Sequence, residues 1–217
     1  MKKAIKPLEA AESIPDGAVI HIGGFMGVGT PNRMIDALVT LGTKNLTVVA
    51  NDTCRPDEGI GKLISAGLVA KAIVSHIGLN PETQQKMISG EMEVELVPQG
   101  TLVERIRAAG FGLGGVLTAT GIGTPVEEGK EIVEVDGKAF LLEKPIRADF
   151  ALIAARQADY AGNLEYSLTA HNFNPIMAMA ADTVIAEPSM IVQLGMISPD
   201  AVKTPGVLID HLIERAA

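Results

Sequence analysis

The chain has 217 residues, of which 47% are hydrophobic and only 3% are aromatic, with no tryptophan. This length suits one large domain or two small ones, and aliphatic side chains must fill the core, which favours helices packed on a sheet over an aromatic-rich β-sandwich. The formal net charge of −8 disfavours nucleic acids and anionic membranes as partners. A phosphate-bearing ligand stays compatible with this charge, because backbone N–H groups bind phosphate locally.

Three sequence features bear on cellular location. The single cysteine, Cys54, cannot form an internal disulfide, which favours a reducing, cytoplasmic setting; we interpret it as a small packed thiol in preference to a nucleophile. Residues 1–12 have a basic start without the apolar stretch of a signal peptide. The longest uncharged stretch, Ala108–Val126, contains too many glycines for a membrane helix and is predicted to be a glycine-rich loop region.

The first half of the chain alternates short apolar runs with segments of helical periodicity. Thr30 is predicted to cap the first helix, with Pro31 at its first position and Gly42 after its end. Such alternation predicts a mainly parallel sheet with helices on both faces. The predicted strands are Ala18–Ile22, Leu46–Ala50, Val69–Ser75 and Met92–Val97, and the predicted helices are Pro31–Leu41, Gly61–Gly67, Pro81–Ser89 and Thr101–Ala109.

The second half of the chain has a different pattern. Within Glu131–Leu142, the pair Asp136-Gly137 separates two apolar runs, which is a strong signal for a β-hairpin. No linker, charge block or repeat divides the chain, so we predict a single α/β domain over residues 1–217: an open, mainly parallel sheet with a β-hairpin extension. Further predicted strands are Asp149–Ala155 and Thr183–Ala186, and further predicted helices are Phe173–Ala181 and Gly206–Arg215.

A glycine-rich turn follows the first predicted strand. Ligands of open parallel sheets bind beyond the carboxyl ends of the strands, glycine lets a ligand approach the backbone closely, and the N-terminus of the next helix offers unpaired N–H groups to an anion. A dinucleotide-binding fold is a rival, because Asp52 resembles its ribose-binding acid; yet neither its glycine pattern nor that of a phosphate loop is present. A third possibility is that the glycines only tighten a turn. The glycines lie at positions 23, 24, 27 and 29.

The segment Asp16–Pro31 resembles the signature of family I CoA-transferases, which is built around a Gly-Gly-Phe turn closed by Gly-x-Pro. The resemblance spans nearly the whole chain in order and is closest to the α subunits of bacterial acetate/butyrate–acetoacetate CoA-transferases. His21 departs from it, because the signature usually carries an aliphatic residue there; we expect an inward or edge histidine with satisfied hydrogen bonds, without a catalytic role. The further matching segments are residues 49–54, 59–63, 97–102, 112–115, 172–175 and 204–206.

The resemblance implies a transferase that is incomplete without a second chain. Enzymes similar to this one attack the thioester with a glutamate, pass through a glutamyl-CoA thioester, and so follow ping-pong kinetics. That glutamate lies in a Glu-Asn-Gly-type motif of the β subunit, and no such motif is present here. The resemblance therefore implies an α2β2 assembly in which CoA is a substrate, with no permanent cofactor or metal. The glutamates present are most simply solvated: Glu91, Glu93, Glu95, Glu104, Glu127 and Glu128.

The resemblance also assigns roles to individual residues. Gln99 is similar to the family's oxyanion donor, and Asn51 to a residue that lines the same pocket. Because both follow predicted strands, we expect them to share one crevice with the glycine turn; a structure with that turn sealed in the core, remote from both, would exclude this hypothesis. The alternatives are an Asx-turn for Asn51 and a helix cap for Gln99. Asn172 and Asn174 are pocket residues or only caps before Pro175. The acyl-CoA site is expected at Gly24, Phe25, Met26, Gly27, Val28, Gly29 and Thr30.

Two other functions fit parts of the pattern. A sugar-phosphate isomerase-like enzyme would use the glycine turn for phosphate and an internal acid–base pair for proton transfer. A non-catalytic CoA-binding protein would use the same turn without a catalytic partner. The preferred acid, whether acetate, butyrate or acetoacetate, depends on side chains from both subunits, because one methylene changes the binding free energy by only about 1–3 kcal/mol.

Overall fold

A nine-stranded, mainly parallel sheet forms the centre of residues 2–214, the part of the chain that this computed structural model describes. Eight strands follow the order β1-β12-β11-β9-β2-β3-β4-β5 with parallel neighbours, and β10 pairs antiparallel with β9. The predicted open parallel sheet is confirmed. The strand bounds are β1 (Ala4–Ile5), β2 (Val19–Ile22), β3 (Leu46–Asp52), β4 (Val69–His76), β5 (Glu93–Leu96), β9 (Ala148–Asp159), β10 (Leu164–Glu165), β11 (Ala181–Val192) and β12 (His211–Ile213).

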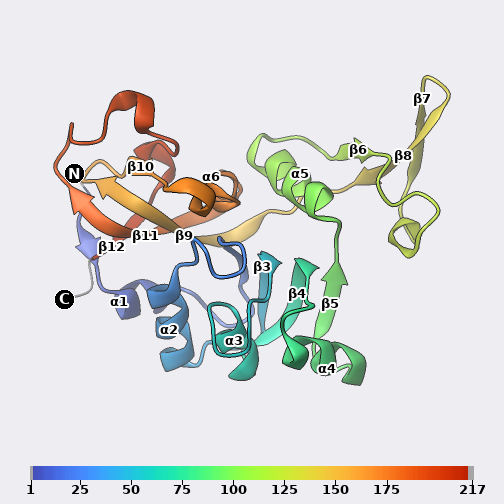
Figure 1. Cartoon of the computed structure of the whole chain (residues 1–217), viewed down its shortest axis with the longest axis horizontal. Helices are drawn as coiled ribbons and strands as arrows, with labels where there is room; N and C mark the ends of the chain where they lie inside the picture. Colours follow the sequence, from blue (N-terminus) through green and yellow to red (C-terminus); the bar gives the residue numbers. More distant parts are fainter. Residues whose placement is uncertain (1, 215–217) are drawn as a thin grey trace.

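Helices cover both faces of the sheet, as predicted (Figure 1). One apolar cluster joins α1, α2 and α3 to strand residues such as Val48 and Leu152. The other joins α5 and α6 to Val49 and Ile153, the next residues along the same strands, whose side chains lie on the opposite face. Strands buried on both faces read as continuous apolar runs, as these do. The helix bounds are α1 (Pro7–Ala11), α2 (Asn32–Leu41), α3 (Gly61–Ser65), α4 (Pro81–Ser89), α5 (Gln99–Gly110) and α6 (Asn174–Met177), with 3₁₀ turns at Pro125–Glu127, Leu168–His171, Pro199–Ala201 and Gly206–Leu208.

A second sheet of three antiparallel strands, β6-β8-β7, projects from the body as an arm (Figure 1). Asp136 and Gly137 join β7 to β8 with φ angles of 52° and 72°, and positive φ at both positions defines the favoured two-residue hairpin turn. The predicted hairpin is confirmed. The prediction of loop throughout Ala108–Val126 is wrong, because β6 lies within it and pairs with β8. The bounds are β6 (Val116–Thr118), β7 (Ile132–Val135) and β8 (Lys138–Glu143).

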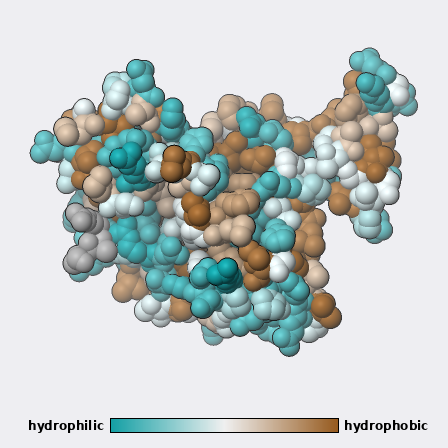
Figure 2. Space-filling model, viewed as in Figure 1, coloured by the Kyte–Doolittle hydropathy of each residue, from teal (hydrophilic) through white to brown (hydrophobic). Residues whose placement is uncertain are grey.

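A buried carboxylate fastens this arm to the body. Glu143 of β8 is only 1% exposed and forms an ion pair with Lys130. Arg105 of α5 lies 3.8 Å from Glu143 and donates a 2.7 Å hydrogen bond to Glu95 at the end of the central sheet. These charges link α5, β5 and the arm. The arm also carries exposed apolar side chains (Figure 2), among them Leu117, Ile132 and Val135.

The predicted helix Gly206–Arg215 is wrong. A 3₁₀ turn ends at Leu208, and β12 follows, parallel to both β1 and β11; Arg215 lies outside the described residues. Leu212 packs into one apolar cluster and Ile213 into the other. Burial on both sides makes the segment a short apolar run, and periodicity alone does not distinguish such a strand from a helix.

Two predicted strands are longer in the structure, and one predicted helix is shorter. Strands β9 and β11 each span 12 residues and pair from Ala148–Ala181 to Asp159–Val192. The predicted helix Phe173–Ala181 is reduced to the four residues of α6, which ends at Met177, and β11 begins at Ala181. The parts of β9 and β11 that were not predicted contain polar residues. A prediction based on apolar runs alone therefore made both strands too short.

Candidate active site

The glycine turn forms a small hairpin at the carboxyl end of β2. Phe25 and Val28 exchange backbone hydrogen bonds of 3.0 and 2.9 Å, and Met26 and Gly27 between them have φ angles of 48° and 83°. The side chains of Phe25, Met26 and Val28 are exposed, whereas Gly24 is buried beneath them. The turn therefore presents apolar side chains to the surface on a fixed backbone.

Two asparagines attach this turn to the opposite half of the chain. The Asn172 Oδ1 accepts a 3.2 Å hydrogen bond from Gly24, and its Nδ2 donates to the carbonyl of Val28 at 2.9 Å. The buried Asn174 donates to the carbonyl of Gly29 at 3.0 Å and accepts from Ala154 at 3.0 Å. Both residues hold the turn in place, which is more than the capping role that was the simpler alternative for them.

Gln99 and Asn51 are brought together, as predicted. Gln99 is the first residue of α5, and its Nε2 donates a 2.6 Å hydrogen bond to the Asn51 Oδ1. Gln99 therefore does not cap its own helix, and Asn51 makes no Asx-turn. The Asx-turn belongs to Asp52, whose Oδ1 accepts from the backbone N–H of Cys54 at 2.8 Å.

The turn and Gln99 share one cavity of about 730 Å³ with a mainly apolar lining. Phe25 and Val28 form one wall, and Gln99 lies on another at the N-terminus of α5. The turn is thus neither sealed in the core nor remote from Gln99. Asn51, which was predicted to share this crevice, is 2% exposed and does not line the cavity; its link to the site is the hydrogen bond from Gln99. Gly27, Gly29 and Thr30 instead line a second cavity of about 660 Å³ on the other side of the turn. The remaining lining residues of the first cavity are Gly100, Val103, Leu168, Thr169, His171, Asn172 and Phe173.

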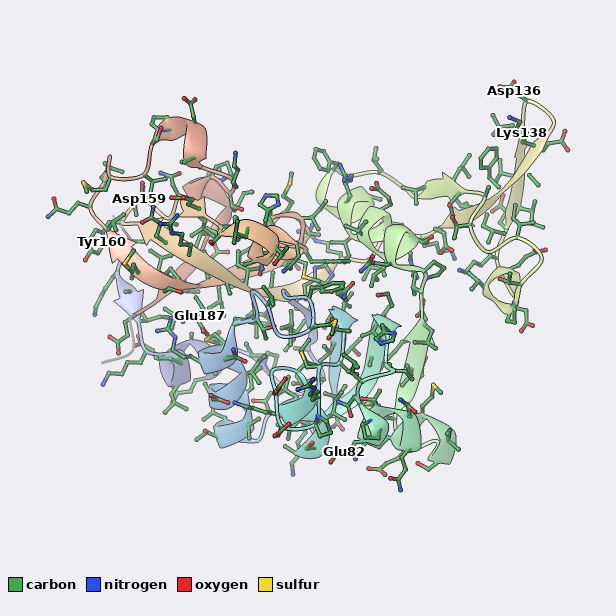
Figure 3. All side chains as sticks on the ribbon, in the orientation of Figure 1. Glu82, Asp136, Lys138, Asp159, Tyr160 and Glu187 are labelled. Atoms are coloured by element: carbon green, nitrogen blue, oxygen red, sulfur yellow. The ribbon has the colours of Figure 1, made fainter. Side chains whose placement is uncertain are left out.

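The N-terminus of α2 differs from its prediction. The helix begins at Asn32, and the Thr30 hydroxyl, buried against Gly24, has no hydrogen-bond partner within residues 2–214, so Thr30 is not the cap. Glu187 of β11, labelled in Figure 3, caps the helix instead. It accepts hydrogen bonds from the N–H groups of Arg33 at 3.2 Å and Met34 at 2.9 Å. The N–H groups at the start of α2 therefore bind the carboxylate of Glu187, a residue of the same chain.

Glu187 also pairs with the Arg33 side chain, whose Nε lies 3.3 Å from its Oε1. Burial raises the pKa of Glu187, against the opposing effect of the Met34 and Arg33 hydrogen bonds. Both of its oxygens are engaged, which makes Glu187 unsuitable as a nucleophile in this conformation. Sequence reasoning missed this residue, because a glutamate within an apolar strand gives no local signal of a distant helix terminus.

His21 is buried, as expected, but its hydrogen bonds are not satisfied. It is fully buried between Val49 and Ala151 of the adjacent strands, and neither ring nitrogen has a hydrogen-bond partner in the described part of the chain. Burial lowers the pKa of His21 to about 4; the Met177 backbone opposes this effect, and the charge of Arg147 lowers the pKa further. The imidazole is therefore neutral at physiological pH.

Cys54 is a packed thiol in the structure, in line with its interpretation from the sequence. It is 5% exposed, and burial together with the neighbouring charge of Asp52 raises its pKa to about 11. A thiol in this state is a poor nucleophile at neutral pH.

We expect Cys54 to resist alkylation in the folded protein. Iodoacetamide at neutral pH should leave the native chain unmodified and label it fully after unfolding in urea, because only the thiolate reacts. Intact-mass spectrometry gives an unambiguous result, since the chain has one cysteine. Rapid labelling of the native chain would contradict the assignment of a buried, protonated thiol.

The six glutamates predicted to be solvated lie outside the cavity that Gln99 lines. Glu95 is the most engaged of them: burial raises its pKa, but the hydrogen bond and charge of Arg105 outweigh that effect and lower the pKa overall. No group of three or more His, Cys, Asp or Glu side chains suited to a metal ion occurs among residues 2–214. Within the same residues, no helix is long and apolar enough to cross a membrane.

Residues 5–215 match the family described as coenzyme A transferase. The chain belongs to the CoA-transferase family. It is 55% identical over 214 residues to the acetate CoA-transferase subunit alpha of Escherichia coli K12, covering 98% of this chain and 97% of that one. It is 54% identical over 202 residues to the acetoacetyl-CoA:acetate/butyrate CoA transferase alpha subunit of Clostridium acetobutylicum, covering 93% of each.

A solved CoA-transferase structure has the same fold. An acyl-CoA transferase from Escherichia coli O157:H7, determined as a thioester complex with CoA, superposes with a TM-score of 0.88 and 25% sequence identity. The match covers 98% of this chain and 47% of that one, so this chain spans about half the length of that transferase. The predicted CoA-transferase fold is confirmed.

Proposed function

We propose that this chain is the α subunit of a cytoplasmic CoA-transferase that moves CoA between a short-chain acyl-CoA and acetate, butyrate or acetoacetate. Residues 1–217 act as one domain, in an α2β2 assembly with a β subunit that supplies the nucleophilic glutamate. CoA enters as a substrate, with no permanently bound cofactor. The main support is the apolar cavity shared by the glycine turn and Gln99, which suits a short acyl chain next to a hydrogen-bond donor.

In this proposal the reaction proceeds in two half-reactions. The glutamate of the β subunit attacks the thioester carbonyl; a mixed anhydride follows, and CoA then forms a thioester with the glutamate as the first carboxylate leaves. The second carboxylate reverses these steps. Each addition places negative charge on a carbonyl oxygen, and Gln99 donates an N–H to that oxygen. One such donor contributes about 3–4 kcal/mol to the stability of the transition state.

The glycine turn and Asn51 support this step without reacting. Residues 24–30 cover the acyl-CoA, and the exposed apolar side chains of Phe25 and Val28 exclude water from the thioester. Asn51 accepts a hydrogen bond from the Gln99 amide and so holds the donor at the edge of the cavity. This chain alone therefore binds and polarises the thioester but has no free nucleophilic glutamate in that cavity.

Separating the two subunits tests the proposal. We expect the purified chain to transfer no CoA between acetyl-CoA and acetoacetate, and the chain co-purified with its β subunit to do so with ping-pong kinetics. With acyl-CoA but no acceptor acid, only the first half-reaction proceeds, and the mass of the β subunit should increase by that of CoA less one water. Transfer by the isolated chain would contradict the divided site.

The same preparation distinguishes the two rival functions. Thermal stabilisation by sugar phosphates but not by acyl-CoA would favour an isomerase-like enzyme. Stabilisation by CoA, together with the absence of any partner carrying a Glu-Asn-Gly-type motif, would favour a non-catalytic CoA-binding protein.

A further inference from the structure

Asp52 occupies a central position beside the candidate site. Its carboxylate is 4% exposed and follows directly on Asn51 at the end of β3. It accepts three N–H groups: the backbone of Met26 at the tip of the glycine turn, the backbone of Cys54, and the side-chain amide of Asn51, each at 2.8 Å. One buried side chain therefore joins the glycine turn to the Asn51–Gln99 pair.

The charge of this carboxylate fixes the orientation of the Asn51 amide. Carboxylate oxygens only accept hydrogen bonds, whereas an amide has one donating and one accepting end. Asn51 must therefore turn its Nδ2 toward Asp52 and its Oδ1 away from it. The Oδ1 then accepts from Gln99 at 2.6 Å, and the Ser75 hydroxyl lies 3.3 Å from the same oxygen.

The orientation of Asn51 in turn fixes that of Gln99. Because Asn51 presents an oxygen, Gln99 must turn its Nε2 inward and use one N–H on Asn51. Gln99 also lines the cavity. The same Nε2 carries a second N–H, which is left free to donate to a ligand there, and Asp52 sets this arrangement through Asn51. An asparagine at position 52 has only one accepting end for these two groups of donors. It would turn its oxygen either toward Met26 and Asn51 or toward Cys54, so it would not secure an acceptor for Asn51.

We propose that Asp52 is a positioning residue of the transfer reaction, which sets the amide polarity of Asn51 and thereby the direction in which Gln99 donates. This inference rests on the proposed function of Gln99. Asp52 makes no contact with the cavity itself and acts through its neighbours. A purely structural role for Asp52 would consist only of holding the Met26 N–H and the strand end.

A double-mutant cycle on the assembled enzyme separates these two roles. We expect Asp52→Asn to lower kcat by roughly 100-fold with KM changed by less than about threefold, because a misdirected oxyanion donor is lost only in the transition state. In the Gln99→Ala background the same substitution should lower kcat by less than about threefold, because residues that act as one unit are not additive. Additive losses would overturn the proposal.

A control variant tests whether the loss of any strand-end carboxylate lowers kcat. Asp149 also accepts a backbone N–H, that of Val19 at 2.8 Å, but at the opposite end of β2. Asp149→Asn removes the same charge, and we expect wild-type kcat from it. A kcat loss equal to that of Asp52→Asn would show that the effect comes from sheet stability and would overturn the proposal.

Neutron diffraction of the assembled enzyme provides a readout that does not depend on activity. We expect deuterons on the Gln99 nitrogen facing Asn51 in the wild type, and a reversed or mixed Asn51 amide in Asp52→Asn. An oxygen of Gln99 facing Asn51 in the wild type would overturn the proposal. If the wild-type assembly transfers no CoA, the proposed function fails, and these deuteron positions still decide whether Asp52 sets the amide order.

Discussion

Gly24→Val should abolish most CoA transfer by the assembled enzyme, with kcat reduced at least about 100-fold. Gly24 has a φ of 125°, and an added Cβ would lie 2.2 Å from the Thr30 Oγ1. Backbone strain of this kind costs of order 1–3 kcal/mol, and relieving the contact must move the turn that carries Phe25 and Val28. A displacement of about 1 Å in a catalytic site reduces the rate roughly 100-fold. Steady-state kinetics and thermal unfolding of the assembly measure the two effects.

A glycine that also has a positive φ but lies outside the site serves as the control. Gly129 has a φ of 74°, precedes the arm strand β7, and leaves free space within 4 Å of an added Cβ. Gly129→Val imposes strain at a positive φ without the contact, and we expect near wild-type kcat with somewhat lower thermal stability. Near wild-type turnover by Gly24→Val would remove the glycine turn from the active site.

His21→Ile should make the folded chain markedly less sensitive to acid. The pKa of His21 is about 4 in the folded chain and 6.5 in its ordinary environment, so the unfolded chain binds a proton more readily. Above pH 6.5 the imidazole is neutral in both states and does not change the free energy of unfolding. As the pH falls from 6.5 toward 4, protonation of the unfolded chain lowers that free energy by about 3 kcal/mol in total. Isoleucine does not titrate, so this loss should disappear in the variant.

Urea unfolding of both chains between pH 7 and pH 4.5 measures the difference. At pH 7 we expect the variant to be at least as stable as the wild type, because isoleucine removes two buried nitrogens without partners, and each unsatisfied polar group costs about 1–3 kcal/mol. Parallel pH dependences for the two chains would show that His21 is protonated equally in the folded and unfolded states, contrary to its burial.

Most of the fold was predictable because its first half obeys local rules. Gly42 ends α2 in the left-handed conformation, and Asp136-Gly137 turns the arm hairpin as the sequence indicates. The errors lie where distant segments decide. β12 is a strand that β1 and β11 flank. α2 begins one residue later than predicted, and its cap comes from Glu187, far along the chain.

The candidate site was predictable at the level of its motifs but not of its hydrogen bonds. Gln99 and Asn51 were predicted to share one crevice because both follow parallel strands; they lie in contact, but only Gln99 lines the cavity. Asp52 was considered only as the ribose-binding acid of a rival fold, whereas its oxygens are occupied by Met26, Asn51 and Cys54. No sequence pattern indicates that a carboxylate will bridge a turn and an amide, because that depends on the separation of two strand ends.

The position of the first strand at the edge of the central sheet has a consequence for biosynthesis. β1 pairs with β12, with Ala4 opposite Leu212 and Ile5 opposite Ile213. The residues between Ile5 and His211 must therefore be synthesised before β1 can pair with β12. Contacts between segments so far apart in sequence form slowly. The edge of β11 stays unpaired until β12 has been made, and a variant that lacks β12 would leave that edge available for aggregation.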